Sequence, residues 1–379
     1  MSRPFVVVLC GGRSAERLVS LVSARCVVAH LPPARFRVRL VHIGADGSWA
    51  EVAPRRLLAE SPAALHAGGA AVRRLRAGAE PLNPWTLLSS LGAQDCAFPV
   101  LHGPLGEDGT LQGLLEMAGA AYVGCGVYGS AAGMDKEATK RVAAQAGLPQ
   151  VPWAVARDAA QALAAARRLG FPVFVKPARM GSSVGVVKAS RPSEVAAALR
   201  EALRYDEKAL VEKGVPAREV ETAVLGDPWA PAGDRFALRA SIVGEIAPNA
   251  EFYDYRAKYL DPDGARLLVP APLPARTAAR VRELALTAFR ALDLYGLARV
   301  DFFVRKDTGA VLFNEPNTLP GFTPASMYPR LWRESGVPTA RLVETLVALA
   351  LRRARARRRL DADPGSSGPR TKRPRGRNN

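Results

Sequence analysis

The chain has 379 residues, which is long enough for two or three domains. Its composition, 48% hydrophobic and 23% charged, is typical of a soluble globular protein, and since no run approaches the roughly 20 apolar residues that span a bilayer, the sequence argues against a membrane-spanning class. The net charge of +18 is typical of a nucleic-acid binder, but residues 352–379, with eleven Arg or Lys and two Asp, carry half of it.

The first elements predict a Rossmann-like unit. FVVVLC, residues 5–10, has the apolar pattern of a buried strand, Gly11-Gly12 turns the chain, and residues 15–29 have the pattern of a helix. Because no small-residue cleavage site follows the apolar run, we interpret it as a core strand and not as a signal peptide. RVRLVHIG and CAFPVLHG are predicted as further parallel strands, and residues 46–92 between them as mixed helix and loop.

The cysteines indicate the redox compartment. The chain has four, in apolar segments and without C-x-x-C spacing: Cys10, Cys26, Cys96 and Cys125. This pattern predicts buried free thiols rather than a zinc site, and it favours a reducing, cytoplasmic location.

The pattern changes after Gly124. Residues 130–146 predict one helix, FPVFVKPA and VVKAS predict two strands joined by the loop ARMGSSVG, and residues 192–205 and ALVEKGV predict a helix and a strand. A long irregular segment at 251–274 then precedes a helix at 275–292, a hairpin at 299–317 and a final helix at 338–358.

The end of the chain is basic and poor in apolar residues. From Asp361 onward it is rich in Pro, Gly, Ser and Arg, so it buries too little surface to fold, and we predict a disordered tail. Contact of this tail with RNA, anionic lipid or polyphosphate is one interpretation, and a solvated tail without a partner is the simpler one.

The hairpin carries oxygen ligands. Asp301 lies on its first strand, and Glu315 and Asn317 lie two residues apart on the second, so the latter two point to the same face. Two carboxylates and an amide suit Mg²⁺ bound together with nucleotide phosphates. Solvent-facing charges on an exposed hairpin are the alternative. The apolar flanks disfavour it, because a carboxylate in a buried sheet needs a partner.

The loop at 179–185 resembles a phosphate-binding loop. Its glycines and serines let backbone N–H groups approach phosphate oxygens, and Lys176 at the end of the preceding strand adds a positive charge. A plain hairpin loop with a surface lysine is the alternative, but the VFVKP context places that lysine at the end of a core strand.

Two polar residues follow neighbouring parallel strands, where ligands bind in α/β sheets. These are Glu16 and His102. A lone residue of either kind at such a place is more often structural, and the occurrence of two on neighbouring strand ends modestly favours a ligand site. The polar and aromatic stretch at 253–259 lies in the long irregular segment, which is typical of a lid or of an ordinary surface loop.

Taken in chain order, these motifs resemble the D-alanine–D-alanine ligase family, whose members have the ATP-grasp fold. The resemblance covers residues 5 to about 350 and is carried by GGRSAERLVSL, LHGPLGEDGTLQGLLE, MDKEATK, FPVFVKPARMGSSVGVVK, VEKGVPAREVE, EFYDYRAKYL, RVDFF and NEPNTLPGFTPASMYP. It implies an α/β chain, α+β within the ATP-grasp lobes, with a three-lobed ATP-grasp fold. The expected parts are a Rossmann-like substrate domain at 1–124, a central lobe with the phosphate loop at 125–214, a C-terminal lobe with lid and metal site at 215–350, and the tail at 351–379.

The resemblance assigns the nucleotide to the second and third lobes. It implies that two lysines hold the ATP phosphates, that a loop closes over them, and that two carboxylates lie near the adenine and the ribose: Lys136 and Lys176; Gly181, Ser182 and Ser183; Glu212 and Glu219. It also implies two Mg²⁺ or Mn²⁺ ions on Asp301, Glu315 and Asn317.

The resemblance also assigns the amino acids. It implies that Glu16, with His102 nearby, binds the first D-alanine, and that Ser326 and Met327 bind the carboxylate of the second. The oxygen of the tetrahedral intermediate is expected on Arg299 and the backbone of Gly321, and the transferred phosphate near Lys258. A latch of Glu16, Ser182 and Tyr259 is expected to close the lid that contains Tyr253.

The activity implied is ADP-forming ligation of two D-alanines through an acyl phosphate, for peptidoglycan precursor synthesis, in a cytoplasmic homodimer. Four residues depart from the usual family pattern: Leu18, Met180, Arg256 and Pro316. Pro316 lacks the N–H of a strand residue and predicts an edge or bulged position.

Two alternatives stay open at this point. A sister ligase would use D-lactate or D-serine as second substrate, although Tyr259 argues against D-lactate. A non-enzymatic nucleic-acid binder would act through the basic tail, but the body of the chain has no RNA-binding signature.

Overall fold

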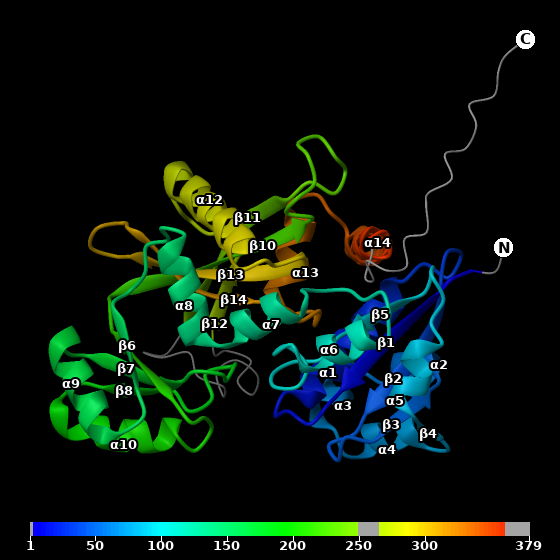
Figure 1. Cartoon of the computed structure of the whole chain (residues 1–379), viewed down its shortest axis with the longest axis horizontal. Coiled ribbons are helices and arrows are strands. Elements are labelled where there is room, and N and C mark those ends of the chain that lie inside the picture. Colours follow the sequence, from blue (N-terminus) through cyan, green and yellow to red (C-terminus); the bar gives the residue numbers. More distant parts are fainter. Residues whose placement is uncertain (1–2, 249–264, 361–379) are drawn as a thin grey trace, which may run out of the picture.

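Three β-sheets organise the residues that the structure describes, 3–248 and 265–360. In this computed structural model each sheet is the centre of one lobe, which confirms the predicted three-lobed α/β architecture (Figure 1). The first lobe, in blue, and the second, in green, lie on opposite sides below the third, in yellow and orange.

The first lobe has a five-stranded sheet with the order β4-β3-β2-β1-β5. The central strand β1 (Phe5–Gly11) is buried on both faces and has parallel neighbours, as predicted, in β2 (Arg37–Ile43) and β5 (Cys96–Pro99). The antiparallel strands β3 (Trp49–Val52) and β4 (Pro81–Leu82) correct the prediction of only helix and loop at 46–92.

Six helices accompany this sheet: α1 (Arg17–His30), α2 (Pro54–Ala59), α3 (Pro62–Ala67), α4 (Ala70–Arg76), α5 (Pro84–Ser89) and α6 (Thr110–Met117). The turn from β1 toward α1 requires glycine. Gly11 has a φ of +91°, and a Cβ there would lie 2.2 Å from the carbonyl oxygen of Ile43. This turn brings the start of α1 to the carboxyl end of the sheet.

The second lobe has a four-stranded antiparallel sheet with the order β6-β9-β7-β8. Its strands are β6 (Trp153–Ala156), β7 (Val173–Pro177), β8 (Val187–Ala189) and β9 (Ala209–Lys213), and its helices are α9 (Ala159–Leu169) and α10 (Pro192–Ala202). The predicted strand–loop–strand unit is confirmed as β7 and β8.

The third lobe has a five-stranded antiparallel sheet with the order β12-β11-β10-β13-β14. Its strands are β10 (Ala217–Gly226), β11 (Arg239–Pro248), β12 (Ala265–Leu268), β13 (Gly296–Arg305) and β14 (Val311–Asn317), and its helices are α12 (Ala275–Ala291), α13 (Met327–Glu334) and α14 (Thr339–Arg357). The predicted hairpin is β13–β14.

The single helix predicted at 130–146 is wrong. The structure has α7 (Val127–Met134) and α8 (Lys136–Gln145), separated at Asp135. The Asp135 carboxylate accepts hydrogen bonds from the backbone N–H groups of Glu137 and Ala138, so it caps the N-terminus of α8. Both helices pack against β14 of the third lobe. The exact limits of the lobes along the chain stay a prediction.

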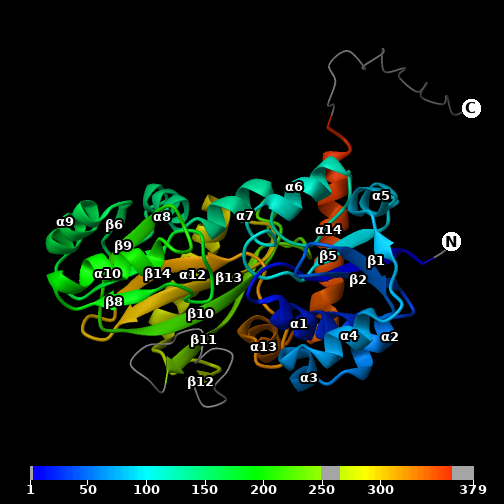
Figure 2. The same ribbon diagram turned by 90° about the horizontal axis from the view of Figure 1, so that it is seen from below.

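A shared core joins the first and third lobes. Tyr328 and Trp332 of α13 belong to the same buried cluster as Val8 of β1 and Phe98 of β5. Helix α14 contacts both β5 and β13 and stands between the two lobes in both views (Figure 2). The continuous core therefore fixes the position of the first lobe relative to the third.

Arg353 of α14 holds the point where the chain leaves the first lobe. Its guanidinium donates hydrogen bonds to the carbonyl oxygens of Gly124 and Tyr122 at 2.8 and 3.0 Å. The same group lies over the rings of Tyr122 and Tyr295, 4.3 and 4.8 Å from their centroids. Arg353 thus ties the connection between lobes to the third lobe.

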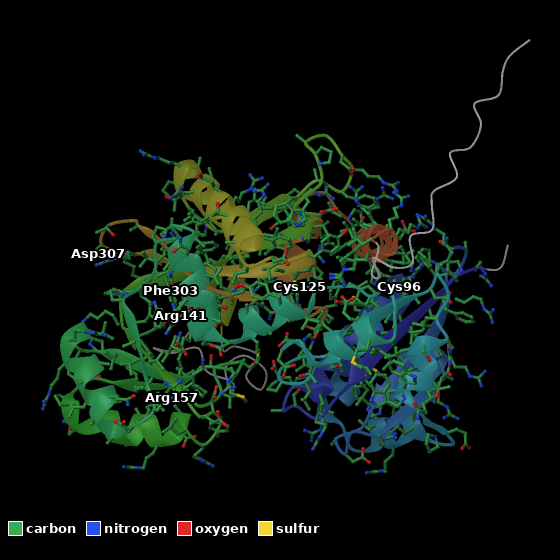
Figure 3. All side chains as sticks on the ribbon, in the orientation of Figure 1. Cys96, Cys125, Arg141, Arg157, Phe303 and Asp307 are labelled. Atoms are coloured by element: carbon green, nitrogen blue, oxygen red, sulfur yellow. The ribbon has the colours of Figure 1, made fainter. Side chains whose placement is uncertain are left out.

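The four cysteines are free thiols, as predicted, although Cys26 is only partly buried. Figure 3 shows Cys96 in the first lobe and Cys125 beside the third. Burial raises the pKa of the Cys96 thiol to about 12 and that of Cys125 to about 11, so both stay protonated and unreactive near neutral pH. Among the described residues, no helix is long and apolar enough to cross a membrane.

Candidate active site

A cavity of about 810 Å³ lies where the three lobes meet. Eleven of the predicted site residues line it: Glu16, His102, Lys136, Gly181, Ser182, Arg299, Glu315, Asn317, Gly321, Ser326 and Met327. They come from the turn before α1, the loop after β5, α8, the loop after β7, β13, β14, the loop before α13 and the first residue of α13. Residues more than 300 positions apart in the chain therefore share one cleft, which no local pattern in the sequence could establish.

The loop between β7 and β8 reaches across to the first lobe. The Ser182 hydroxyl donates a hydrogen bond to the Glu16 carboxylate, and Ser182 and Ser183 have left-handed backbone with φ of +53° and +59°. Left-handed backbone is uncommon for residues other than glycine and concentrates at functional sites. Lys136 donates from Nζ to the carbonyl oxygen of Met180 at 2.6 Å, so α8 supports the loop from the other side.

The hairpin β13–β14 places its oxygen-bearing side chains together. Asp301 faces Glu315 across the ladder and Arg299 faces Asn317. Arg299 donates to both oxygens of Asp301 at 2.8 and 2.7 Å, and Lys136 lies 3.2 Å from Glu315. Each of these two carboxylates therefore has a cationic side chain as its neighbour.

Pro316 lies on β14, the edge strand of the sheet, and pairs with Val300; the ladder shifts register one pair further on, between Asp301 and Phe302. The predicted edge position is confirmed. At an edge with an irregular ladder, the missing N–H of proline is tolerated. Glu315 and Asn317 both line the cavity on either side of it.

The oxygen set fits a hard cation. Asp301, Glu315 and Asn317 supply two carboxylates and one amide from adjacent strands, which is the donor chemistry of Mg²⁺ sites completed by phosphate. In the part of the chain that the structure describes, no three His, Cys, Asp or Glu residues gather as a metal cluster, so the set depends on the Asn317 amide.

Behind the cavity lies a buried row of charges. The Glu212 carboxylate binds Lys140 through Oε1 at 2.6 Å and Lys176 through Oε2. Burial alone would raise the pKa of Glu212, but the two lysines outweigh it and lower the pKa to about 2. Burial would likewise lower the pKa of Lys176, and Glu212 reverses this and raises it. The two ammonium groups outnumber the carboxylate within this row, and the Glu315 and Glu219 carboxylates also act on Lys176 from nearby.

His102 and Glu107 form a buried pair at the carboxyl end of the first sheet. His102 Nδ1 lies 3.9 Å from Glu107 Oε1, and the backbone N–H of Gly103 donates to the other carboxylate oxygen at 2.7 Å. Burial would lower the pKa of His102, but the nearby carboxylates of Glu107 and Glu16 raise it overall. His102 therefore keeps a positive charge to higher pH than an ordinary histidine does.

The loop before α13 forms the opposite wall. The Ser326 hydroxyl accepts a hydrogen bond from the backbone N–H of Thr323 at 3.0 Å. A Cβ on Gly321 would lie 2.8 Å from that hydroxyl oxygen, so only glycine fits there without moving Ser326. Gly321 thus leaves its backbone open toward the cavity.

The remaining predicted residues divide into two groups. Five are described but do not line the cavity directly: Lys176, Ser183, Glu212, Glu219 and Asp301. Tyr253, Lys258 and Tyr259, together with Arg256, lie outside the described residues. The predicted lid and the tyrosine of the latch therefore stay predictions.

The polar residues of the site that are missing from the sequence prediction include Glu107, Lys140 and Glu221. Lys140 follows Lys136 by one helical turn, Glu107 lies five residues after His102, and Glu221 lies two residues after Glu219 on the same strand. Glu221 is buried, lies 3.1 Å from Arg299 and lines the cavity. In each case the short distance in sequence from a predicted site residue was a signal that could have identified the missing one.

The fold and the site together define an ATP-grasp ligase, in which a Rossmann-like lobe and two sheet lobes enclose a cavity lined by lysine, arginine and carboxylate groups. Residues 5–125 match the family described as D-ala D-ala ligase N-terminus, and residues 142–348 match the one described as D-ala D-ala ligase C-terminus. The chain belongs to the D-alanine–D-alanine ligase family.

Individual relatives match nearly the full length of the chain. The D-alanine–D-alanine ligase of Heliobacterium modesticaldum is 44% identical over 95% of this chain and 98% of its own length, and D-alanine–D-alanine ligase A of Bradyrhizobium diazoefficiens is 47% identical over 94% and 97%. Among solved structures, the D-alanine–D-alanine ligase from Coxiella burnetii has a TM-score of 0.80 at 34% identity, covering 95% of this chain and 97% of its own. The VanG D-Ala:D-Ser ligase from Enterococcus faecalis has a TM-score of 0.77 at 30% identity, covering 92% and 100%.

Proposed function

We propose that this chain joins two D-alanines in an ATP-dependent, ADP-forming reaction and so supplies the dipeptide for peptidoglycan precursors. Similarity at 44–47% identity over nearly the full length of D-alanine–D-alanine ligases supports the activity. The observation that carries the mechanism is the single cavity in which Glu16, Lys136, Arg299 and Glu315 converge.

A carboxylate is a poor acyl donor, so it must first be activated. In the proposed reaction a carboxylate oxygen of the first D-alanine attacks the γ-phosphorus of ATP, the bond to the β-phosphate oxygen breaks, and ADP leaves. The amine of the second D-alanine then attacks the acyl phosphate, and phosphate leaves as the peptide bond forms. Both steps place negative charge on oxygen, which fixed cations stabilise.

The nucleotide end of the site is assigned to the second lobe and α8. Lys136 and Lys176 are the phosphate-binding cations, and the backbone N–H groups of Gly181, Ser182 and Ser183 cover the phosphates. Glu212 and Glu219 take the adenine and the ribose. The two ammonium groups of the Lys140–Glu212–Lys176 row support this assignment, because they outnumber the carboxylate within the row and attract the phosphates of ATP.

Asp301, Glu315 and Asn317 are the proposed ligands of two Mg²⁺ or Mn²⁺ ions. When bound, such ions would supply positive charge that neutralises the charge developing on the phosphate oxygens. Asp301 and Glu315 are already ion-paired with Arg299 and Lys136, so the carboxylates are held in place on the hairpin.

The first lobe is the proposed site of the first D-alanine. The Glu16 carboxylate takes its ammonium group, with His102 nearby, and the hydrogen bond from Ser182 to Glu16 links the nucleotide loop to this site. The proposed completion of the latch by Tyr259 and the closure of the lid with Tyr253 and Lys258 would exclude water from the acyl phosphate.

The third lobe is the proposed site of the second D-alanine. Ser326 and Met327 bind its carboxylate at the start of α13, and Arg299 and the backbone of Gly321 stabilise the oxygen of the tetrahedral intermediate. All four residues line the cavity, which supports this assignment.

The test is phosphate release from ATP with D-alanine alone, and with D-alanine plus D-lactate or D-serine, across pH. We expect release with D-alanine alone and D-alanyl-D-alanine as the main product. Similarity to a D-Ala:D-Ser ligase structure keeps the sister activity as the second candidate, and a D-alanyl-D-serine product would favour it.

A nucleic-acid-binding role through the basic tail predicts a different outcome. Deletion of residues 360–379 should leave phosphate release unchanged in a ligase, because the cavity residues precede them. Loss of a bound polyanion without loss of turnover would assign the tail a separate role. A homodimer and a cytoplasmic location complete the proposal. Sedimentation and cell fractionation test them.

A further inference from the structure

Ser23 makes a hydrogen bond between two lobes beside the cavity. It lies on α1, its side chain is fully buried, and its Oγ accepts a hydrogen bond from the backbone N–H of Phe322 at 3.1 Å. The same oxygen lies 3.2 Å from His102 Nε2. Ser23 and His102 belong to the first lobe and Phe322 to the loop before α13, so one hydroxyl joins α1 to that loop.

The loop is anchored at Phe322. The ring of Phe322 is buried. It packs edge-on against Phe98, with 6.2 Å between centroids, and in a tilted arrangement against Tyr328, with 5.9 Å between centroids. Its backbone N–H is held by Ser23. The ring limits how far the loop moves, and the hydrogen bond fixes how its peptide groups are turned.

The adjacent residue is Gly321, which lines the cavity. A Cβ on Gly321 would lie 3.6 Å from Ser23 Oγ and 3.8 Å from His102 Cε1. The Ser23 and His102 side chains therefore lie close to Gly321 on the side where a Cβ would project. Because a peptide unit is planar, the Phe322 N–H and the Gly321 C=O turn together, so a change in the Phe322 N–H direction would change the backbone ψ angle of Gly321.

The bond to Phe322 survives titration of His102. A hydroxyl has one proton and two lone pairs. When His102 Nε2 is unprotonated, Ser23 donates to it and accepts from Phe322. When Nε2 carries a proton, Ser23 accepts from both. The loop thus keeps the same anchor in either state of the histidine.

We propose that Ser23 is a positioning residue that sets the Gly321–Phe322 backbone for the oxygen of the tetrahedral intermediate and for the second amino acid. Helix α1 begins immediately after Glu16, the residue assigned to the first amino acid. One helix therefore positions both halves of the reaction, the first through Glu16 and the second through Ser23. This inference rests on the proposed ligase function.

Ser20 is the matched control. It lies on the same helix and is equally buried, and it also makes two hydrogen bonds, accepting from Gly11 N at 2.8 Å and donating to the carbonyl of Val100. Both partners lie in the first lobe. Ser20→Ala and Ser23→Ala therefore each remove one buried hydroxyl from the same helix, but only Ser23→Ala removes a hydrogen bond to the loop before α13.

The experiment measures kcat and the two KM values for D-alanine in the full-length wild type, Ser20→Ala and Ser23→Ala, together with their melting temperatures. Wild-type turnover tests the ligase function by itself. For Ser23→Ala we expect kcat over the second KM to fall about 10- to 100-fold, the size of effect of a misplaced reacting group, with the first KM changed by less than about threefold. Ser20→Ala should change both KM values equally or not at all.

A Ser23→Ala variant that matches Ser20→Ala in both KM values and in kcat would overturn the proposal, because the hydroxyl would then be only structural. If the alanine variant does not fold, the same kinetic constants are measured in Ser23→Cys. Sulfur is a larger and weaker acceptor than a hydroxyl oxygen, so a loss confined to the second site supports the proposal, and wild-type kinetics in Ser23→Cys contradict it.

Discussion

Lys140 offers the sharpest test of the buried charge row. Its side chain is 1% exposed, and its Nζ lies 2.6 Å from Glu212 Oε1, while Lys176 binds the other carboxylate oxygen. Replacement by Met keeps most of the apolar stem and removes the charge. Glu212 is then left with Lys176 as its cation in the row.

The expected loss follows from this arrangement. Removing one partner of a buried ion pair typically costs about 3–5 kcal/mol because a buried charge is left uncompensated. Here Glu212 keeps Lys176, and burial already lowers the pKa of Lys140, so removing Lys140 also relieves a desolvation cost. We therefore expect Lys140→Met to lose about 2 kcal/mol of unfolding free energy, below that range.

Nucleotide binding should change as well. In the wild type Lys140 neutralises Glu212, which leaves Lys176 able to partner a phosphate. In the variant Lys176 must serve Glu212 by itself, so the KM for ATP should rise about tenfold, equivalent to about 1.4 kcal/mol. The KM values for D-alanine should change less, because Lys140 does not line the cavity.

The pH dependence has a defined sign. The pKa of Glu212 is lowered from its ordinary 4.5 to about 2, so its ion pairs stabilise the fold fully above about pH 4.5 and lose this contribution as the pH falls toward 2. The variant has fewer cations on Glu212 and should show a smaller acid-dependent loss over this range.

The assay is urea unfolding without nucleotide, from pH 7 down to the acid transition, together with ATP kinetics. Arg141→Met is the control on the same helix. Arg141 is exposed and pairs with Glu137 at 2.7 Å, so we expect a loss of at most about 1 kcal/mol (Figure 3). Equal unfolding free energies and equal KM values for ATP in the two variants would refute the reasoning.

Three further predictions concern the lobe junction, the hairpin and the histidines. Arg353→Met removes two hydrogen bonds to backbone carbonyls and a stacked cation, so it should cost about 2 kcal/mol in thermal or urea unfolding; a loss below about 0.5 kcal/mol would contradict this role. Pro316→Ile should leave the Mg²⁺ dependence of phosphate release unchanged because Pro316 lies on an edge strand, whereas tighter Mg²⁺ dependence would mean that proline distorts the ligands. In NMR titrations, assigned with Asn variants of each, His102 should titrate above pH 6.5 and His42, whose pKa burial and Arg76 lower, near pH 4; the reverse order would be incompatible with the described packing.

Local pattern determined much of this protein. The continuous apolar run of β1, the strand–loop–strand unit of β7 and β8, the hairpin β13–β14 and the helix α14 are all readable from the sequence, because their hydrogen bonds and burial repeat over a few residues. The ordered set of motifs also indicated the family and eleven of the residues that line the cavity.

Only the tertiary structure decided which side chains meet. The break at Asp135 depends on a carboxylate that caps α8, and β3 and β4 form because a neighbouring strand edge is available. The Lys140–Glu212 pair and the Ser23–Phe322 bond join residues 72 and 299 positions apart. Such contacts depend on how the lobes pack. The periodic pattern of a sequence shows which face of a helix or strand is buried, but it does not show which distant residue a side chain on that face contacts.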